Sequence, residues 1–163
     1  MNIFAFHKCP ASAACDHCDR HVCKMTIEYA QLLSTALLLH GIKDSQLYKM
    51  THQHGRFAQW AATSSSNFEW LLELFVETAL QYQLRYGKTH ATFIRMQQGL
   101  VFEKYKLELP NKNLTPPPVA KLEGLTKWSQ VTRANREYFN EHKQHIARWK
   151  FGEPTWYRPN HTG

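Results

Sequence analysis

The sequence predicts an all-α protein: a compact single domain of about four to five helices, with a short extended N-terminal arm. Apolar residues recur at helical spacing in several long segments, and no segment alternates as a half-buried strand does. The length of 163 residues lies near the usual size of one domain. With 43% hydrophobic and 20% charged residues, the composition excludes disorder as the main state. We therefore expect residues 1–163 to form one helical domain.

The N-terminal third predicts the arm and the first long helix. Residues 2–6 are apolar and read as a strand or an extended arm. From Ser12 the pattern turns helical, and Asp16 or Asp19 has the residue type of an N-cap. Gly41 supplies a stop after this helix, because glycine readily takes the left-handed conformation of a C-terminal cap.

The middle of the chain predicts a loop and two helices. Residues 43–57 are polar and read as a loop. The serines and asparagine at 64–67 offer caps for an amphipathic helix that ends near Gly87. A third helix is expected over 88–105. Trp60 and Trp70 are expected in the core rather than as stacking platforms.

A Pro-rich connection precedes the last helical segment. Residues 114–118 contain three consecutive prolines, which break helical structure and give a semi-rigid link. Helical spacing returns over 127–150, and the tail at 153–157 is expected to be irregular.

Positive charge is concentrated in the last third of the chain. Of the net charge of +7, residues 1–103 contribute +1 and residues 104–163 contribute +6. Cations pair with phosphates and aromatic faces stack on bases, so this segment predicts DNA as the partner. A solvated helix face is the alternative. The candidate contacts are Arg136, Lys143 and Trp156.

The chain shows neither a signal peptide nor a run long enough to span a membrane. Its longest aliphatic stretch is Ala36 to Leu39, whereas a span needs about 20 residues. We expect a cytoplasmic protein of a phage or bacterial host cell, with no membrane partner and no cofactor.

All four cysteines lie within fifteen residues, near His7, His17 and His21. The spacing of Cys15 and Cys18 resembles that of zinc ligands. A helix starting near Asp19 would set Cys18 and Cys23 about 140° apart, which opposes a shared metal. Buried free thiols are therefore favoured over a zinc site.

The first long helix carries a narrow polar stripe on an otherwise apolar surface. At 100° per residue the stripe covers an arc of about 80°. It either lines a cleft with acid/base groups or forms an internal network in which Lys24 and Glu28 pair at i, i+4. The members of the stripe are His21, Lys24, Glu28, Gln31 and Thr35. Gln31 is also a candidate DNA contact.

Two further clusters are candidate phosphate contacts. His52 and His54 lie in the expected polar loop, where solvent, a local backbone bond or a metal is the alternative partner. Arg85, Lys88 and His90 cluster at a helix end, where cations also interact favourably with the helix dipole.

The sequence resembles two groups of proteins. An opening M-N-I-F and a helix C-D-R-H-V-C-K-M at 18–25 resemble a family of uncharacterised phage and giant-virus proteins. The pattern of Asp19, His21 and Glu28, with Pro-Thr-Trp-Tyr at 154–157, resembles small all-α phage pyrimidine-dimer DNA glycosylases.

The glycosylase resemblance implies a chemistry. Glu28 would be the catalytic carboxylate, with His21 near the DNA and Lys24 in the same cleft. A carboxylate stabilises the oxocarbenium character that develops when a glycosidic bond breaks. In that family a terminal α-amine attacks the sugar. Here Asn2 is too bulky for ordinary removal of Met1, so the amine would belong to Met1. Water as nucleophile, and a non-catalytic nucleic-acid-binding module with or without zinc, stay open as alternatives.

Overall fold

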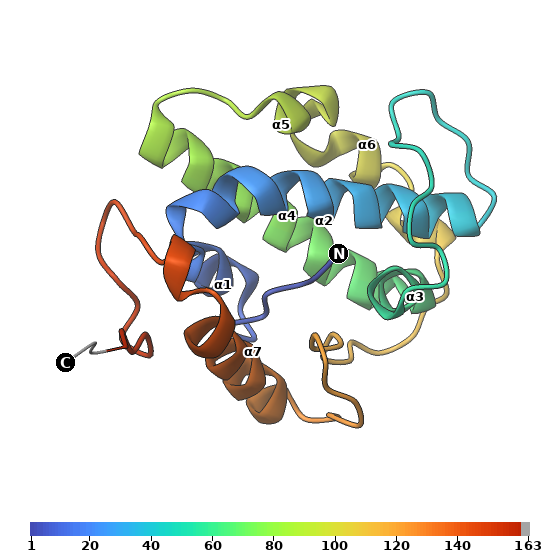
Figure 1. Cartoon of the computed structure of the whole chain (residues 1–163). Coiled ribbons are helices and arrows are strands. Elements are labelled where there is room, and N and C mark those ends of the chain that lie inside the picture. Colours follow the sequence, from blue (N-terminus) through green and yellow to red (C-terminus); the bar gives the residue numbers. More distant parts are fainter. Residues whose placement is uncertain (161–163) are drawn as a thin grey trace.

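The computed structural model describes residues 1–160, which contain seven α-helices and three short 3₁₀ turns (Figure 1). Within this range the only β pairing is an isolated bridge between Val119 and Leu122. The all-α prediction is confirmed, but the expected number of helices was too low. The helices are α1 (Pro10–Asp16), α2 (Asp19–Leu39), α3 (Arg56–Thr63), α4 (Ser65–Tyr86), α5 (Ala91–Arg95), α6 (Leu100–Glu103) and α7 (Trp128–His142). The 3₁₀ turns are η1 (Gln97–Gly99), η2 (Lys106–Glu108) and η3 (Gln144–Ile146).

The two long helices α2 and α4 form the centre of the fold. They pack against each other, α3 packs against both, and α1 packs against α4. One cluster of buried apolar side chains extends from Ile3 to Phe139 in α7. The helices therefore enclose a continuous core.

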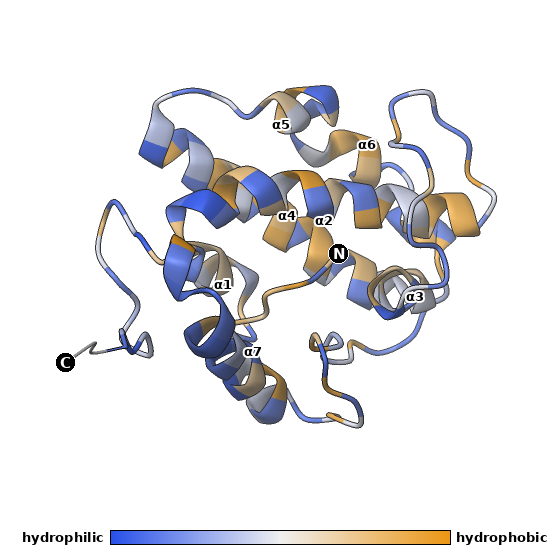
Figure 2. Ribbon diagram, viewed as in Figure 1, coloured by the Kyte–Doolittle hydropathy of each residue, from blue (hydrophilic) through white to orange (hydrophobic). Residues whose placement is uncertain are grey.

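The N-terminal arm is extended, as predicted, and it is part of this core. Ile3, Phe4, Ala5 and Phe6 are each at most 3% exposed. The arm is apolar and runs between the α2 and α7 regions (orange segment from N in Figure 2). Burial of these side chains holds the arm in place on the helices, because removing apolar area from water stabilises the folded position.

Helix α4 follows the predicted boundaries, whereas the start of α2 does not. The Ser64 hydroxyl accepts a hydrogen bond from the Asn67 backbone at 3.0 Å, and Gly87 ends α4 at φ +69°. The N-cap of α2 is Cys18, so the predicted cap at Asp16 or Asp19 is wrong. Both carboxylates instead bind side chains from distant segments.

The predicted helix over 88–105 is wrong: the chain forms α5, η1 and α6 instead. Gln97, Gln98 and Gly99 have φ of +47°, +56° and +95°. A Cβ at Gly99 would lie 3.0 Å from the Val76 side chain of α4. Close packing on α4 therefore interrupts a segment whose local pattern is helical.

Two other boundaries also differ. Helix α3 begins at Arg56, at the end of the predicted loop 43–57, and α7 ends at His142 rather than 150. Trp60 and Trp70 are buried, as predicted, and lie edge to face at 6.0 Å.

Within residues 1–160, none of the helices has the length and apolar character that crossing a membrane requires.

Candidate functional site

The polar stripe of α2 divides into a buried part and a surface part. His21 and Thr35 are buried, whereas Lys24, Glu28 and Gln31 reach the surface or its edge. The Thr35 hydroxyl donates to the Thr51 carbonyl at 3.2 Å and accepts from its N–H at 3.1 Å, which attaches the loop before α3 to α2. The predicted stripe is thus one line of residues with two different environments.

Glu28 lies beside the first residues of the chain. The Asn2 N–H donates to Glu28 Oε2 at 3.3 Å, and Lys24 Nζ lies 3.6 Å from Oε1. Glu28 is 16% exposed and Lys24 is 69% exposed. The predicted i, i+4 pair therefore forms, and it forms at the surface.

Covalent geometry places the α-amine of Met1 close to this carboxylate. Three bonds separate the amine nitrogen from the Asn2 nitrogen, so the two atoms lie within about 4 Å of each other. Added to the Asn2 hydrogen bond, this puts the amine about 7 Å or less from Glu28 Oε2. An amine, a carboxylate and an ammonium therefore share one small area of surface.

His21 lies under the arm rather than in an open cleft. Its ring stacks on Phe4 with centroids 4.4 Å apart, and Phe139 meets it edge-on at 5.5 Å. Nδ1 is buried and has no hydrogen-bond partner among the described residues. Burial, followed by the charges of His17, Lys143 and Lys24, holds the pKa of His21 well below its usual value. The imidazole is neutral at pH 7 and supports the arm, so we no longer assign it an acid/base role.

A buried chain of hydrogen bonds holds the arm from the other side. The Phe4 N–H donates to the Tyr29 hydroxyl at 3.3 Å, and that hydroxyl lies 2.6 Å from His17 Nε2. His17 Nδ1 lies 2.7 Å from the Ala13 carbonyl and must donate to it, so Nε2 accepts from Tyr29. Burial lowers the pKa of His17 to about 4. Sequence reasoning missed this chain, because two of its three hydrogen bonds join residues that are 12 and 25 positions apart.

A hollow of about 400 Å³ lies farther along the same surface, toward the loop before α3. Gln31 of the stripe lines it together with Lys49, Met50 and Arg95. Arg95 lies over the Tyr48 ring at 4.1 Å. Gln31, a predicted DNA contact, thus has a cationic neighbourhood. His52 and His54 are exposed in the same loop, and His52 has a positive φ of +48°.

In the predicted cluster of Arg85, Lys88 and His90, two residues have structural roles. Arg85 is buried, and its guanidinium donates to the carbonyls of His17 and Cys15 and to the Asp19 carboxylate. His90 caps α5 by accepting from the Thr92 N–H at 3.1 Å. We therefore leave both out of the proposed interface. Lys88 is exposed.

Arg136 and Trp156 also hold structure together. Arg136 donates twice to the Phe6 carbonyl, at 2.7 and 3.0 Å. Trp156 stacks on Phe6 at 4.7 Å and donates to the Asp16 carboxylate at 2.5 Å. Phe6 lies four residues beyond Asn2, about 13 Å along an extended chain. Trp156 therefore contacts the far end of the arm and not Glu28.

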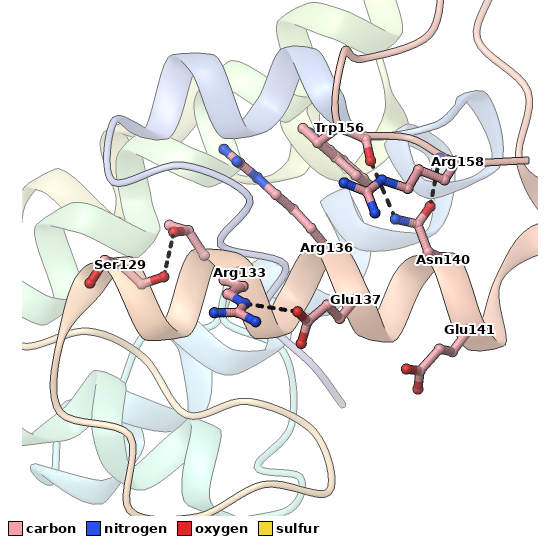
Figure 3. Close-up of a pocket in the computed structure, with 9 residues that line it drawn as sticks. Ser129, Arg133, Arg136, Glu137, Asn140, Glu141, Trp156 and Arg158 are labelled. Carbon is pink, nitrogen blue, oxygen red and sulfur yellow. Dashed lines mark hydrogen bonds and ion pairs between the residues drawn. The ribbon is translucent and has the colours of Figure 1, made fainter.

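An open hollow of about 660 Å³ lies on the outer face of α7 (Figure 3). Arg133 is turned toward Glu137 in a 2.9 Å ion pair, and Asn140 lies between Trp156 and Arg158 (Figure 3). Acidic and basic groups alternate here. The helix predicted over 127–150 thus ends at His142, and Lys143, Arg148 and Lys150 lie beyond α7.

Metal ligation finds no support in the part of the chain that the structure describes. Within residues 1–160, no three His, Cys, Asp or Glu side chains gather where they could hold an ion. The four cysteines are free thiols, and burial raises the pKa of Cys18 to about 11. We do not carry the zinc alternative further.

Comparison of this chain with protein-family models, curated proteins and solved structures gives no match. Both resemblances in the sequence therefore stay predictions, and the geometry around Glu28 is the basis for a functional proposal.

Proposed function

We propose that this protein is a DNA N-glycosylase that releases a damaged or modified base, with Glu28 as the catalytic carboxylate. The observation that carries the proposal is the hydrogen bond from Asn2 to Glu28, because it brings the α-amine of Met1 beside an anionic carboxylate. Lys24, on the other carboxylate oxygen, adds a cation that can approach a phosphate.

The proposed reaction uses the amine as nucleophile. The unprotonated α-amine attacks C1′ of the sugar as the bond between C1′ and the base breaks, and the base leaves with the bonding electrons and takes up a proton. Glu28 stabilises the positive charge that develops on the sugar. Ring opening gives an imine between the Met1 nitrogen and C1′, which water then hydrolyses. If water attacks C1′ instead, no covalent intermediate forms.

Base release tests the proposal directly. The protein is incubated with duplexes that each contain one damaged or modified base, and abasic sites are measured. Glu28→Gln keeps the shape of the side chain and removes its charge, so we expect base release to fall at least 100-fold with folding preserved. Glu73→Gln, at an exposed position on α4, is the matched control and should retain full activity.

Trapping with borohydride tests the role of the amine. Reduction should give a covalent protein–DNA adduct with the wild-type protein. A protein with one extra residue ahead of Met1 should give none, because the amine is moved about 3.6 Å along the chain. Base release without any adduct would identify water as the nucleophile.

A non-catalytic nucleic-acid-binding module is the second candidate. It is favoured by the open hollow of about 660 Å³ on α7, whose lining does not include Glu28. Binding of DNA without release of any base, in the wild type and in Glu28→Gln alike, would favour it.

A further inference from the structure

Tyr138 of α7 occupies an unusual position above the N-terminal arm. Its half-buried ring lies 6.3 Å from Phe4, tilted by 38°, and 4.9 Å from His142. Phe4 in turn stacks on His21. Tyr138 thus lies between Phe4 on the core side and the exposed ring of His142.

Two ammonium groups from different segments flank this ring. Lys143 Nζ lies 5.8 Å from the ring centroid and Lys121 Nζ lies 6.0 Å from it. Both distances are at the outer limit of a cation–π contact, so the ring engages neither cation strongly. Among residues 1–160, neither lysine is in an ion pair. The two positive charges remain available to an anion.

The backbone holds Lys121 in a strained conformation. Its φ is +63°, in a tight turn where the Leu122 N–H donates to the Val119 carbonyl at 3.3 Å. The Arg56 guanidinium donates to the carbonyls of Leu122 and Val119, at 2.6 and 2.9 Å respectively. A left-handed conformation is strained for a residue with a side chain, and such strain concentrates at functional sites.

A hollow of about 240 Å³ adjoins the ring, with Lys121, Tyr138 and His142 in its lining. It is smaller than the pockets of about 300–1,000 Å³ that enclose whole drug-sized ligands. Its other wall carries Glu137 and Glu141, which disfavour a phosphate on that side. Lys121 lines the hollow, and Lys143 lies outside its lining but near the same ring, so a planar ring with an attached anionic group matches this combination of features.

We propose that Tyr138, Lys121 and Lys143 bind one unpaired nucleotide of a nucleic-acid strand, with the base on the tyrosine ring and the phosphate between the two ammoniums. The inference rests on the proposed function, because it supplies the strand contact next to Glu28. Phe4 under Tyr138 and Asn2 beside Glu28 are two residues apart, about 7 Å along the extended arm.

Binding of a fluorescent oligothymidylate, measured by anisotropy over a range of salt concentrations, tests this inference. Stacking on an aromatic ring contributes about 1–3 kcal/mol per base, so Tyr138→Leu should weaken binding about 5- to 150-fold. Tyr138→Phe keeps the ring and should bind within about twofold of wild type. A matched duplex should be affected much less, because its bases are already stacked.

Lys121→Gly separates binding from folding. Glycine relieves the strain at φ +63° and removes the ammonium, so the melting temperature should not fall while affinity for the oligonucleotide does. The slope of log affinity against log salt should shrink by about 0.7, the value for one single-strand phosphate contact. Lys112→Met, at an exposed position elsewhere, should leave the melting temperature and the salt slope unchanged and the affinity within about twofold of wild type.

The outcomes distinguish this site from the proposed enzyme. Weakened binding in the Tyr138→Leu and Lys121→Gly proteins supports the nucleotide site even if no base is ever released, which would defeat only the glycosylase proposal. Affinities equal to wild type in both proteins overturn the site. Binding to phosphatidylserine vesicles with none to the oligonucleotide also overturns it, since an anionic lipid headgroup would then be the ligand.

Discussion

The surface around Glu28 and the C-terminal segment that packs on α1 use charged residues in opposite ways. Glu28 accepts a single hydrogen bond of 3.3 Å and has a lysine at 3.6 Å. Asp16, in contrast, accepts bonds from His7 at 2.8 Å and from Trp156 at 2.5 Å. The carboxylates that bind the tail are occupied by the protein, whereas Glu28 retains capacity for another partner. Asp16 and Glu28 are close in the sequence, yet Asp16 has a structural role and Glu28 has the proposed catalytic role.

The largest effect is expected where Arg85 joins α4 to the start of α2. Arg85→Met removes the donor to two carbonyls and the cationic donor to the Asp19 carboxylate, which then keeps only the Lys150 N–H. Breaking a buried pair from one side costs about 3–5 kcal/mol, so the free energy of unfolding in urea should fall by about that amount. Lys88→Met is the exposed control and should change it by less than about 0.5 kcal/mol. Equal stabilities would mean that Arg85 is not a structural residue.

A slightly smaller effect is expected from acid, through the buried His17. Its pKa in the folded protein is about 4, against about 6.5 for an exposed histidine. The unfolded chain therefore takes up this proton first, and the associated stability is complete above pH 6.5 and decreases as the pH falls toward 4. The shift corresponds to about 3 kcal/mol.

Urea unfolding at pH 7 and pH 4 measures this dependence. Wild type should lose about 3 kcal/mol more between the two pH values than His17→Gln does. His52→Gln, which removes an exposed histidine, should keep the wild-type dependence. Parallel pH curves for wild type and His17→Gln would contradict the buried neutral chain.

The smallest effect on stability is expected at Lys24. Its side chain is 69% exposed and its pair with Glu28 is long, so Lys24→Met should change the free energy of unfolding by less than about 1 kcal/mol. Affinity for DNA and base release should nevertheless decrease if Lys24 contacts a phosphate. A loss of several kcal/mol would show instead that Lys24 and Glu28 form a structural pair, which would abolish the contrast with Arg85.

Local sequence patterns predicted the parts of the fold that local interactions decide. The α4 boundaries follow from the Ser64 cap and from Gly87, whose left-handed conformation ends the helix. The polar stripe of α2 follows from helical periodicity alone. The break at Gln97 and Gln98 was not predictable in this way, because it results from close packing of Gly99 on Val76, more than twenty residues earlier.

The sequence by itself therefore determined the all-α class and the two central helices. Tertiary structure decided which polar residues are buried in hydrogen bonds or packing and which remain accessible to a ligand. Arg85 and His21 have the residue types of a binding site, yet packing buries both. Glu28 was already a candidate from the sequence, and the tertiary structure added the contact with Asn2, because the N-terminal arm folds back across α2. Periodicity along one helix carries no information about such contacts, because they depend on which distant segment covers each face.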